Sequence, residues 1–318
     1  MMPMDEVFAP SQVITDNIAL IEKEQSLAEE KRICELSALA GEAADHLLSL
    51  AEGGMPTVDA LSLLSFDTER APALHDNAME ASGKHLAFHA GLLSSLDRTV
   101  LCSLLYEALK KRGLCPTEAD FLPPASSPET FTYVKNFYAD EAYDVFSDAF
   151  SDPRVFYSET LRDAVLAVSE GRAGYCLLPL EEKGGTRLAS VSELLYKSEL
   201  RIASVTPVYG YGEENDLTYA LISRGFLIPE LGSDVDRYLE LRLPKDAASL
   251  SELLFAAEAC GAQVFRIHTQ RSDSGGERST HYSLVLRTEG LDFSTLLIYL
   301  SVFVKEFTPI GIYASLES

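Results

Sequence analysis

Residues 171–205, GRAGYCLLPLEEKGGTRLASVSELLYKSELRIASV, decide the fold of the central part of this chain. Residues 173–178 form an apolar run that is typical of a strand buried on both faces. A short helix over 191–196 and a second strand over 200–205 follow it. A strand, a helix and a strand in this order predict an α/β module with a parallel sheet.

The same alternation continues on both sides of this stretch. Strands are predicted at 131–134, 154–157 and 217–223, and helices at 140–150 and 160–170. A linker at 114–130 that contains four prolines separates this module from the N-terminal third. The N-terminal third has helical periodicity over 14–47, 72–93 and 96–112 and predicts a helical domain.

The C-terminal part follows a second junction at 225–236. Strands are predicted at 237–243, 263–270, 280–286 and 309–314, and helices at 249–260 and 293–305. This β-α-β-β-α-β order is ferredoxin-like. The fold class is therefore α/β plus α+β, with a helical domain at 1–113, an α/β domain at 131–225 and a ferredoxin-like domain at 235–318.

Composition excludes several classes of partner. The 318 residues contain 26 Lys and Arg against 49 Asp and Glu, a net charge of −23, which disfavours nucleic acid and anionic membrane surfaces. No apolar run reaches the roughly 18 residues of a membrane span, and residues 1–10 do not resemble a signal peptide. The five cysteines are odd in number and contain no CxxC pair. We therefore expect a soluble cytoplasmic protein with reduced cysteines.

Few residues indicate chemistry without further context. Gly184-Gly185-Thr186 follows a strand and precedes a helix, so its amides are placed either to hold an anion or to form a plain turn. The pair Glu181-Glu182 fits acid–base chemistry or a solvated turn. His85 and His89 have metal-ligand spacing on a helix but no third ligand, so we expect surface histidines, no metal and no cofactor. None of these features defines a reaction.

The quoted stretch resembles prephenate dehydratase, the enzyme that converts prephenate to phenylpyruvate by decarboxylative dehydration. The positions that match the family pattern are Gly171, Ala173, Tyr175, Pro179, Glu181, Gly185, Leu194 and Leu195. Residues 215–220, NDLTYA, stand where the family has N-x-T-R-F. The resemblance implies that Thr218 is the catalytic hydroxyl, that Glu181 and Asn215 position the substrate, and that Gly185 and Thr186 bind it.

The C-terminal part resembles the ACT regulatory domain that follows this enzyme. Ala248-Ser249-Leu250 takes the place of the family's Gly-Ala-Leu, and Ile267-His268-Thr269 falls on its Ile-Glu-Ser. The resemblance implies a homodimer and an effector site for an aromatic amino acid at Ala248, Ser249, Leu250, His268 and Thr269.

This domain order makes the helical third resemble a chorismate mutase, with Asp67-x-x-Arg70 as its motif. That resemblance implies that Arg70, Arg32 and Lys111 hold the carboxylates of chorismate.

Departures from the family set the functional expectation. Tyr219 and Ala220 replace the Arg and Phe of T-R-F, and only residues 206–217 stand where the family has a second lobe. We therefore expect a truncated, single-lobe, periplasmic-binding-like domain whose pocket is open to water and lacks preorganised donors. The first hypothesis is a non-catalytic or regulatory relative that binds an aromatic amino acid or a prephenate-like ligand. The alternatives are an active chorismate mutase–prephenate dehydratase and a scaffold for self-association.

Overall fold

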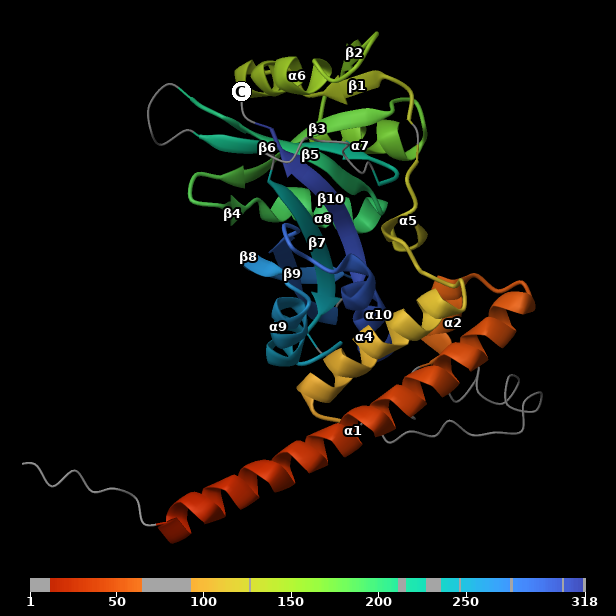
Figure 1. The fold of residues 1–318 in the computed structure, drawn as a ribbon. Helices are drawn as coiled ribbons and strands as arrows, with labels where there is room; N and C mark the ends of the chain where they lie inside the picture. The colour runs from red at the N-terminus through yellow and green to blue at the C-terminus, as the bar shows by residue number, and fades with distance from the viewer. Residues whose placement is uncertain are drawn as a thin grey trace, which may run out of the picture.

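A single mixed sheet runs through the molecule in the computed structural model (Figure 1). The structure describes residues 12–64, 93–125, 127–210, 216–226, 236–245, 247–274, 277–304 and 306–316. The strand order is β2-β1-β3-β6-β5-β10-β7-β9-β8, and the short β4 (Thr186–Arg187) pairs with β3 outside this path. The fold is therefore mixed α/β, as the sequence predicts.

The α/β half contains five of these strands and three helices. Helix α6 lies on one face of the sheet, and α7 and α8 lie on the other (Figure 1). The element bounds are β1 Thr130–Tyr133, α6 Phe137–Ser147, β2 Arg154–Tyr157, α7 Leu161–Ser169, β3 Tyr175–Glu182, α8 Ala189–Ser198, β5 Arg201–Val208 and β6 Leu217–Ser223.

The expectation of a parallel sheet is wrong for β6. Strands β1, β2 and β3 pair in parallel, but β6 runs antiparallel to both β3 and β5. The reason lies in the connection between β5 and β6, which contains only residues 209–216. A parallel crossover needs about a dozen residues or more, whereas a shorter connection returns the chain as a hairpin.

The C-terminal half has the predicted β-α-β-β-α-β order. Its strands β10, β7, β9 and β8 are neighbours in that order, and each adjacent pair is antiparallel. The two helices pack on one face of these strands. The bounds are β7 Arg237–Pro244, α9 Leu250–Ala259, β8 Gln263–Ser274, β9 Glu277–Arg287, α10 Phe293–Phe303 and β10 Thr308–Ser315.

Strand β10 joins the two halves of the molecule. It pairs antiparallel with β7 and, on its other edge, in parallel with β5, so that Gly311 lies opposite Ile202. A Cβ at position 311 would lie well inside the contact distance of the Ile202 carbonyl oxygen, so glycine is required there. The segments 131–225 and 235–318 therefore share one sheet, although the sequence analysis treats them as separate domains.

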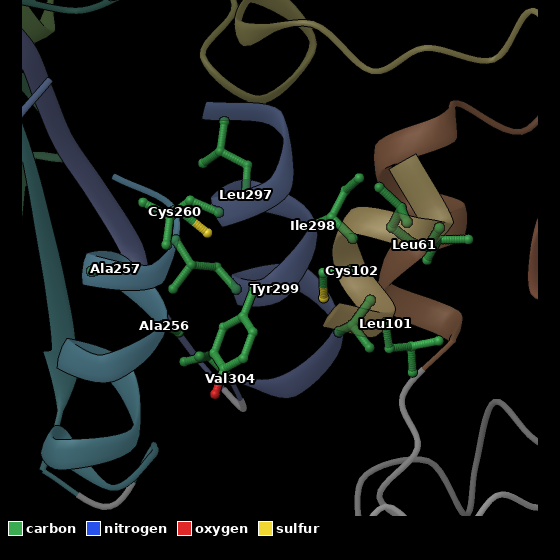
Figure 2. Close-up of a cluster of buried hydrophobic side chains, with 14 of the residues drawn as sticks. Leu61, Leu101, Cys102, Ala256, Ala257, Cys260, Leu297, Ile298, Tyr299 and Val304 are labelled. Carbon is green, nitrogen blue, oxygen red and sulfur yellow. The ribbon is translucent and has the colours of Figure 1, made fainter. Parts of the chain in front are cut away.

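The N-terminal helices cover the helical face of the C-terminal half. Helix α10 lies between the sheet and helices α2 and α4, and for this reason all its residues from Thr295 to Val302 are buried. Figure 2 shows Leu61 and Leu101 of this helical layer facing Ile298 of α10. The bounds are α1 Gln12–Glu52, α2 Thr57–Leu63, α4 Ser95–Lys111 and α5 Glu118–Phe121.

The described residues limit two of the sequence-based interpretations. Most of the predicted helix at 72–93 lies outside them, as do Asp67, Arg70, His85 and His89. Within the described part, no helix is long and apolar enough to span a membrane, and no His, Cys, Asp and Glu cluster is suited to a metal. All five cysteines are free, and two of them, Cys34 and Cys115, are exposed.

Candidate functional site

A large pocket lies on the face of the C-terminal strands opposite α9 and α10. The turn from β3 to β4 and the helix α8 cover this face, and a pocket of about 1060 Å³ remains between them. Pockets for small ligands usually measure about 300–1,000 Å³. The lining includes Gly184–Arg187, Ser192 and Tyr196 of α8, Arg242 of β7, residues 266–270 of β8 and His281 of β9.

A buried ion pair fixes β4 to the C-terminal strands. Glu240 of β7 is only 2% exposed, and the two guanidinium Nη atoms of Arg187 donate to its two carboxylate oxygens at 3.0 Å. The hydroxyls of Ser283 and Tyr313 donate to the same carboxylate at 2.6 and 3.0 Å. Burial acts to raise the pKa of Glu240, but Arg187 and these hydrogen bonds outweigh it and hold that pKa below 4.5.

A second carboxylate, Glu181 at the end of β3, pairs with arginines from both halves and lies close to His268. Its oxygens lie 3.2 Å from Arg187 Nη2, 2.5 Å from Arg266 Nη1 and 3.5 Å from His268 Nε2. Burial opposes ionisation of Glu181, but His268, Arg187 and Arg266 together lower its pKa. Glu181 is therefore a charged carboxylate at neutral pH, and it connects the α/β half to β8.

These two lowered pKa values predict acid sensitivity. A carboxylate whose native pKa is depressed contributes stability that is present above its unfolded pKa and is lost as the pH falls through the native pKa. We expect the free energy of unfolding in urea to be steady from about pH 8 to 6 and to fall below about pH 4.5. The variant Glu240→Gln is expected to lose less stability over this acid range. An equal loss in both proteins would contradict the assignment.

A second, smaller pocket of about 150 Å³ lies beside Thr218. Thr218 pairs with Glu181 across β6 and β3, and both residues line this space. The C-terminal strands contribute Tyr238, Phe265 and Tyr313 to the same lining. The C-terminal half thus supplies the wall that the sequence analysis expects to be missing, although no second α/β lobe is present in the described part of the chain.

Residues predicted for two different sites share the larger pocket. Gly185 and Thr186, expected to bind substrate, line it together with His268 and Thr269, which were expected to bind an effector. Gly185 has a φ of +79°, and a Cβ there would collide with the Arg266 guanidinium. The turn that carries Gly185 is therefore packed directly against β8.

The remaining predicted site residues lie elsewhere. Ala248, Ser249 and Leu250 stand at the start of α9 and do not line the pocket, and the Ser249 hydroxyl lies 2.8 Å from that of Ser251. Asn215 and Arg70 lie outside the described residues.

The two predicted mutase residues inside the described part are far apart. Arg32 of α1 pairs with Asp97 in the first turn of α4, whereas Lys111 is the last residue of that helix. At 1.5 Å per residue, these two ends of α4 are about 21 Å apart. Arg32 and Lys111 therefore do not converge on one small molecule.

Four charged residues at the centre of the site are not identified by the sequence patterns: Arg187, Glu240, Arg242 and Arg266. In residues 237–244, RYLELRLP, charged and apolar side chains alternate, a pattern that is typical of a strand with one solvent-facing side. In the structure, α8 and β4 cover that side. The alternation of charged and apolar residues places Glu240 and Arg242 on one face of the strand, but no local sequence pattern shows that α8 and β4 cover this face.

Comparisons with known proteins found likeness only among solved structures. No family model and no curated protein matches the chain. The chain is similar to prephenate dehydratase from Streptococcus mutans, with 13% identity over 59% of this chain and 98% of that one and a TM-score of 0.48. It is similar to a structure described as GqqA, a novel type of quorum quenching acylase. The identity is 19% over 59% of this chain and 96% of that one, and the TM-score is 0.45. It is also similar to prephenate dehydratase from Arthrobacter aurescens in complex with L-Phe. The identity is 13% over 58% of this chain and 90% of that one, and the TM-score is 0.44.

Proposed function

We propose that this chain is a non-catalytic, regulatory relative of prephenate dehydratase that binds an aromatic amino acid or a prephenate-like carboxylate. The observation that carries the proposal is the size of the space beside Thr218, the expected catalytic hydroxyl. That space is about 150 Å³, below the 300–1,000 Å³ usual for ligand pockets, because residues of the C-terminal strands occupy the surroundings. A ring that carries two carboxylates has no room there.

The protonation state of Glu181 supports the same conclusion. Loss of water from prephenate requires a proton for the departing hydroxyl, and a general acid works best with a pKa near the operating pH. The pKa of Glu181 is lowered, its oxygens already pair with Arg187 and Arg266, and His268 Nε2 lies 3.5 Å away. The carboxylate beside Thr218 is therefore an ion-pair partner that connects two parts of the fold, and it holds no proton to donate at neutral pH.

Self-association belongs to the same proposal. Strand β8 is the last in the sheet order, so one of its edges has no neighbouring strand in the described part of the chain. Phe265 and Ile267 on this strand are 44% and 38% exposed. Exposed edges of this kind favour pairing with another chain, which supports a homodimer, and we place this homodimer in the cytoplasm as part of the proposal.

The proposal makes a direct prediction about ligand binding and turnover. Purified protein is expected to convert neither chorismate nor prephenate, whereas phenylalanine, tyrosine or prephenate is expected to raise its melting temperature. A ligand at 100 times its Kd that binds only the folded state adds about 2.7 kcal/mol to the free energy of unfolding. Absorbance assays of both conversions and a thermal shift titration provide the measurements. Appearance of phenylpyruvate, or no shift with any of these compounds, would refute the proposal.

A further inference from the structure

Arg242 of β7 is a buried cation whose charge has no acidic partner among the described residues. Its side chain lines the larger pocket, and the residue is only 7% exposed. Its one aromatic contact places the guanidinium carbon 4.5 Å from the centre of the Tyr196 ring. By contrast Arg187, on the same side of the sheet, is bound by both Glu240 and Glu181. Arginines are seldom fully buried unless they are paired.

The carboxylates near Arg242 are already engaged. Glu240 attracts Arg242 electrostatically, but both its oxygens accept from Arg187, Ser283 and Tyr313. Glu193 at the rim of the pocket pairs with Lys197 at 2.6 Å. Burial lowers the pKa of Arg242 to about 10, against the partial compensation by Glu240. A buried charge without a hydrogen-bonded partner is costly, and an anion in the pocket would remove that cost.

The start of helix α8 supplies a second, independent feature of the pocket. Its N-cap residue is Leu188, which has no side-chain cap, and Ala189 and Ser190 of the first turn line the pocket. Ser192 also lines this space, is only 5% exposed, and its hydroxyl oxygen is buried with no hydrogen-bond partner. Uncapped N–H groups and the dipole at a helix N-terminus favour a bound anion.

Beyond these polar groups the pocket offers flat and apolar surface. The rings of Tyr196 and His281 lie 5.3 Å apart at 45°, and Ile267 of β8 lines the same space. Ser192 and Tyr196 are four residues apart on α8, so they point to the same side of the helix. An anion bound by Arg242 and Ser192 would therefore place its ring beside His281 and Ile267, next to the Tyr196 ring on which Arg242 stacks.

We infer that this pocket is a binding site for a small organic anion with a planar ring, anchored by Arg242 and Ser192. The anion site stands on the two unpartnered side chains alone, and only the identification of its ligand as aromatic rests on the proposed function. A carboxylate matches the planar donor face of Arg242 in a bidentate, charge-assisted pair. The site lies under α8 and is separate from the small pocket beside Thr218, although Arg266 lines both.

Isothermal titration with four probes tests this assignment: phenylalanine, prephenate, benzoate and the uncharged benzyl alcohol. We expect the wild-type protein to bind at least one carboxylate and to bind benzyl alcohol at least tenfold more weakly than benzoate. Arg242→Gln is expected to weaken carboxylate binding tenfold to a hundredfold, Ser192→Ala less, and Arg242→Lys to an intermediate extent. The matched control is Arg98→Gln, because Arg98 also stacks on a ring, 5.4 Å from the centre of Phe303, in the helical layer. It is expected to bind as the wild type does.

The ligand-free proteins provide a second readout. Because Arg242→Gln removes a buried charge that has no partner, its melting temperature without ligand is expected to equal or exceed that of the wild type. Wild-type affinity in Arg242→Gln would overturn this inference and leave the proposed function intact, since the ligand would then bind elsewhere. A marked fall in the ligand-free melting temperature of Arg242→Gln would also overturn it. Failure of the wild type to bind any of the probes would refute both proposals.

Discussion

Replacing Arg187 by methionine is expected to lower the free energy of unfolding by about 3–5 kcal/mol, the usual cost of leaving a buried charge without its partner. Arg187 is buried between β4 and the C-terminal strands and binds both oxygens of Glu240 at 3.0 Å. Without it, Glu240 at 2% exposure keeps only the two hydroxyl donors, Ser283 and Tyr313. The native state must then hold a poorly compensated carboxylate or take up a proton.

Urea unfolding at neutral pH measures this loss. The control is Arg172→Gln, which breaks an exposed pair with Glu170 at 2.8 Å and should cost no more than about 1 kcal/mol. The double variant Arg187→Met, Glu240→Leu removes both charges and is expected to recover part of the lost stability. A loss below about 1 kcal/mol in Arg187→Met would show that the pair is unimportant for the fold.

Replacing Gly311 by valine is expected to cost about 3 kcal/mol, at the upper end of the range for overpacking a dense interior. The added Cβ meets the carbonyl oxygen and the Cβ of Ile202 on the neighbouring strand β5. Since β10 pairs with β5 on one edge and β7 on the other, neither neighbour can move away without opening the sheet. The substitution therefore separates the two halves at their only direct strand pairing in the described residues.

Gly41→Ala is the matched control for this prediction. Gly41 lies inside α1, where a Cβ meets nothing within 4 Å, so alanine is expected to stabilise the protein by about 0.5–1 kcal/mol. Urea unfolding gives both values, and hydrogen exchange of the β5 and β10 amides locates the damage. If the β5 amides of Gly311→Val exchanged at the wild-type rate, the pairing of β10 with β5 would tolerate a side chain at position 311, and the prediction would be wrong.

Local patterns in the sequence predict most elements of this fold. The helical spacing in residues 14–47, followed by Gly53-Gly54, predicts α1 and its end, and the alternating runs after residue 236 predict the β-α-β-β-α-β order. The pairing of β10 with β5 connects residues more than a hundred positions apart, and no local pattern specifies it. The direction of β6, in contrast, was implied by the short connection at 209–216.

The candidate site was predictable only in pieces. The glycines before Thr186 indicate a turn suited to an anion, and the resemblance to the ACT domain implies an effector role for His268, but only the fold brings the two together. Glu240 and Arg242 could not be identified, because alternating charges in a strand are typical of a face in water. Because α8 buries this face, Glu240 forms an ion pair with Arg187, whereas Arg242 has no counter-charge of its own.

The place of β10 between β5 and β7 has a consequence for how the chain reaches its native state. The Ser204 hydroxyl donates to the Ala314 carbonyl across 110 positions of sequence, so the centre of the sheet closes through contacts of very high contact order. Folding through such contacts is slow. Until β10 docks, β5 and β7 each present an unsatisfied backbone edge, the usual starting point of aggregation. Expression of either half on its own would therefore yield an aggregation-prone fragment. A chaperone that covers the edge of β5 during synthesis would reduce aggregation of the intact chain.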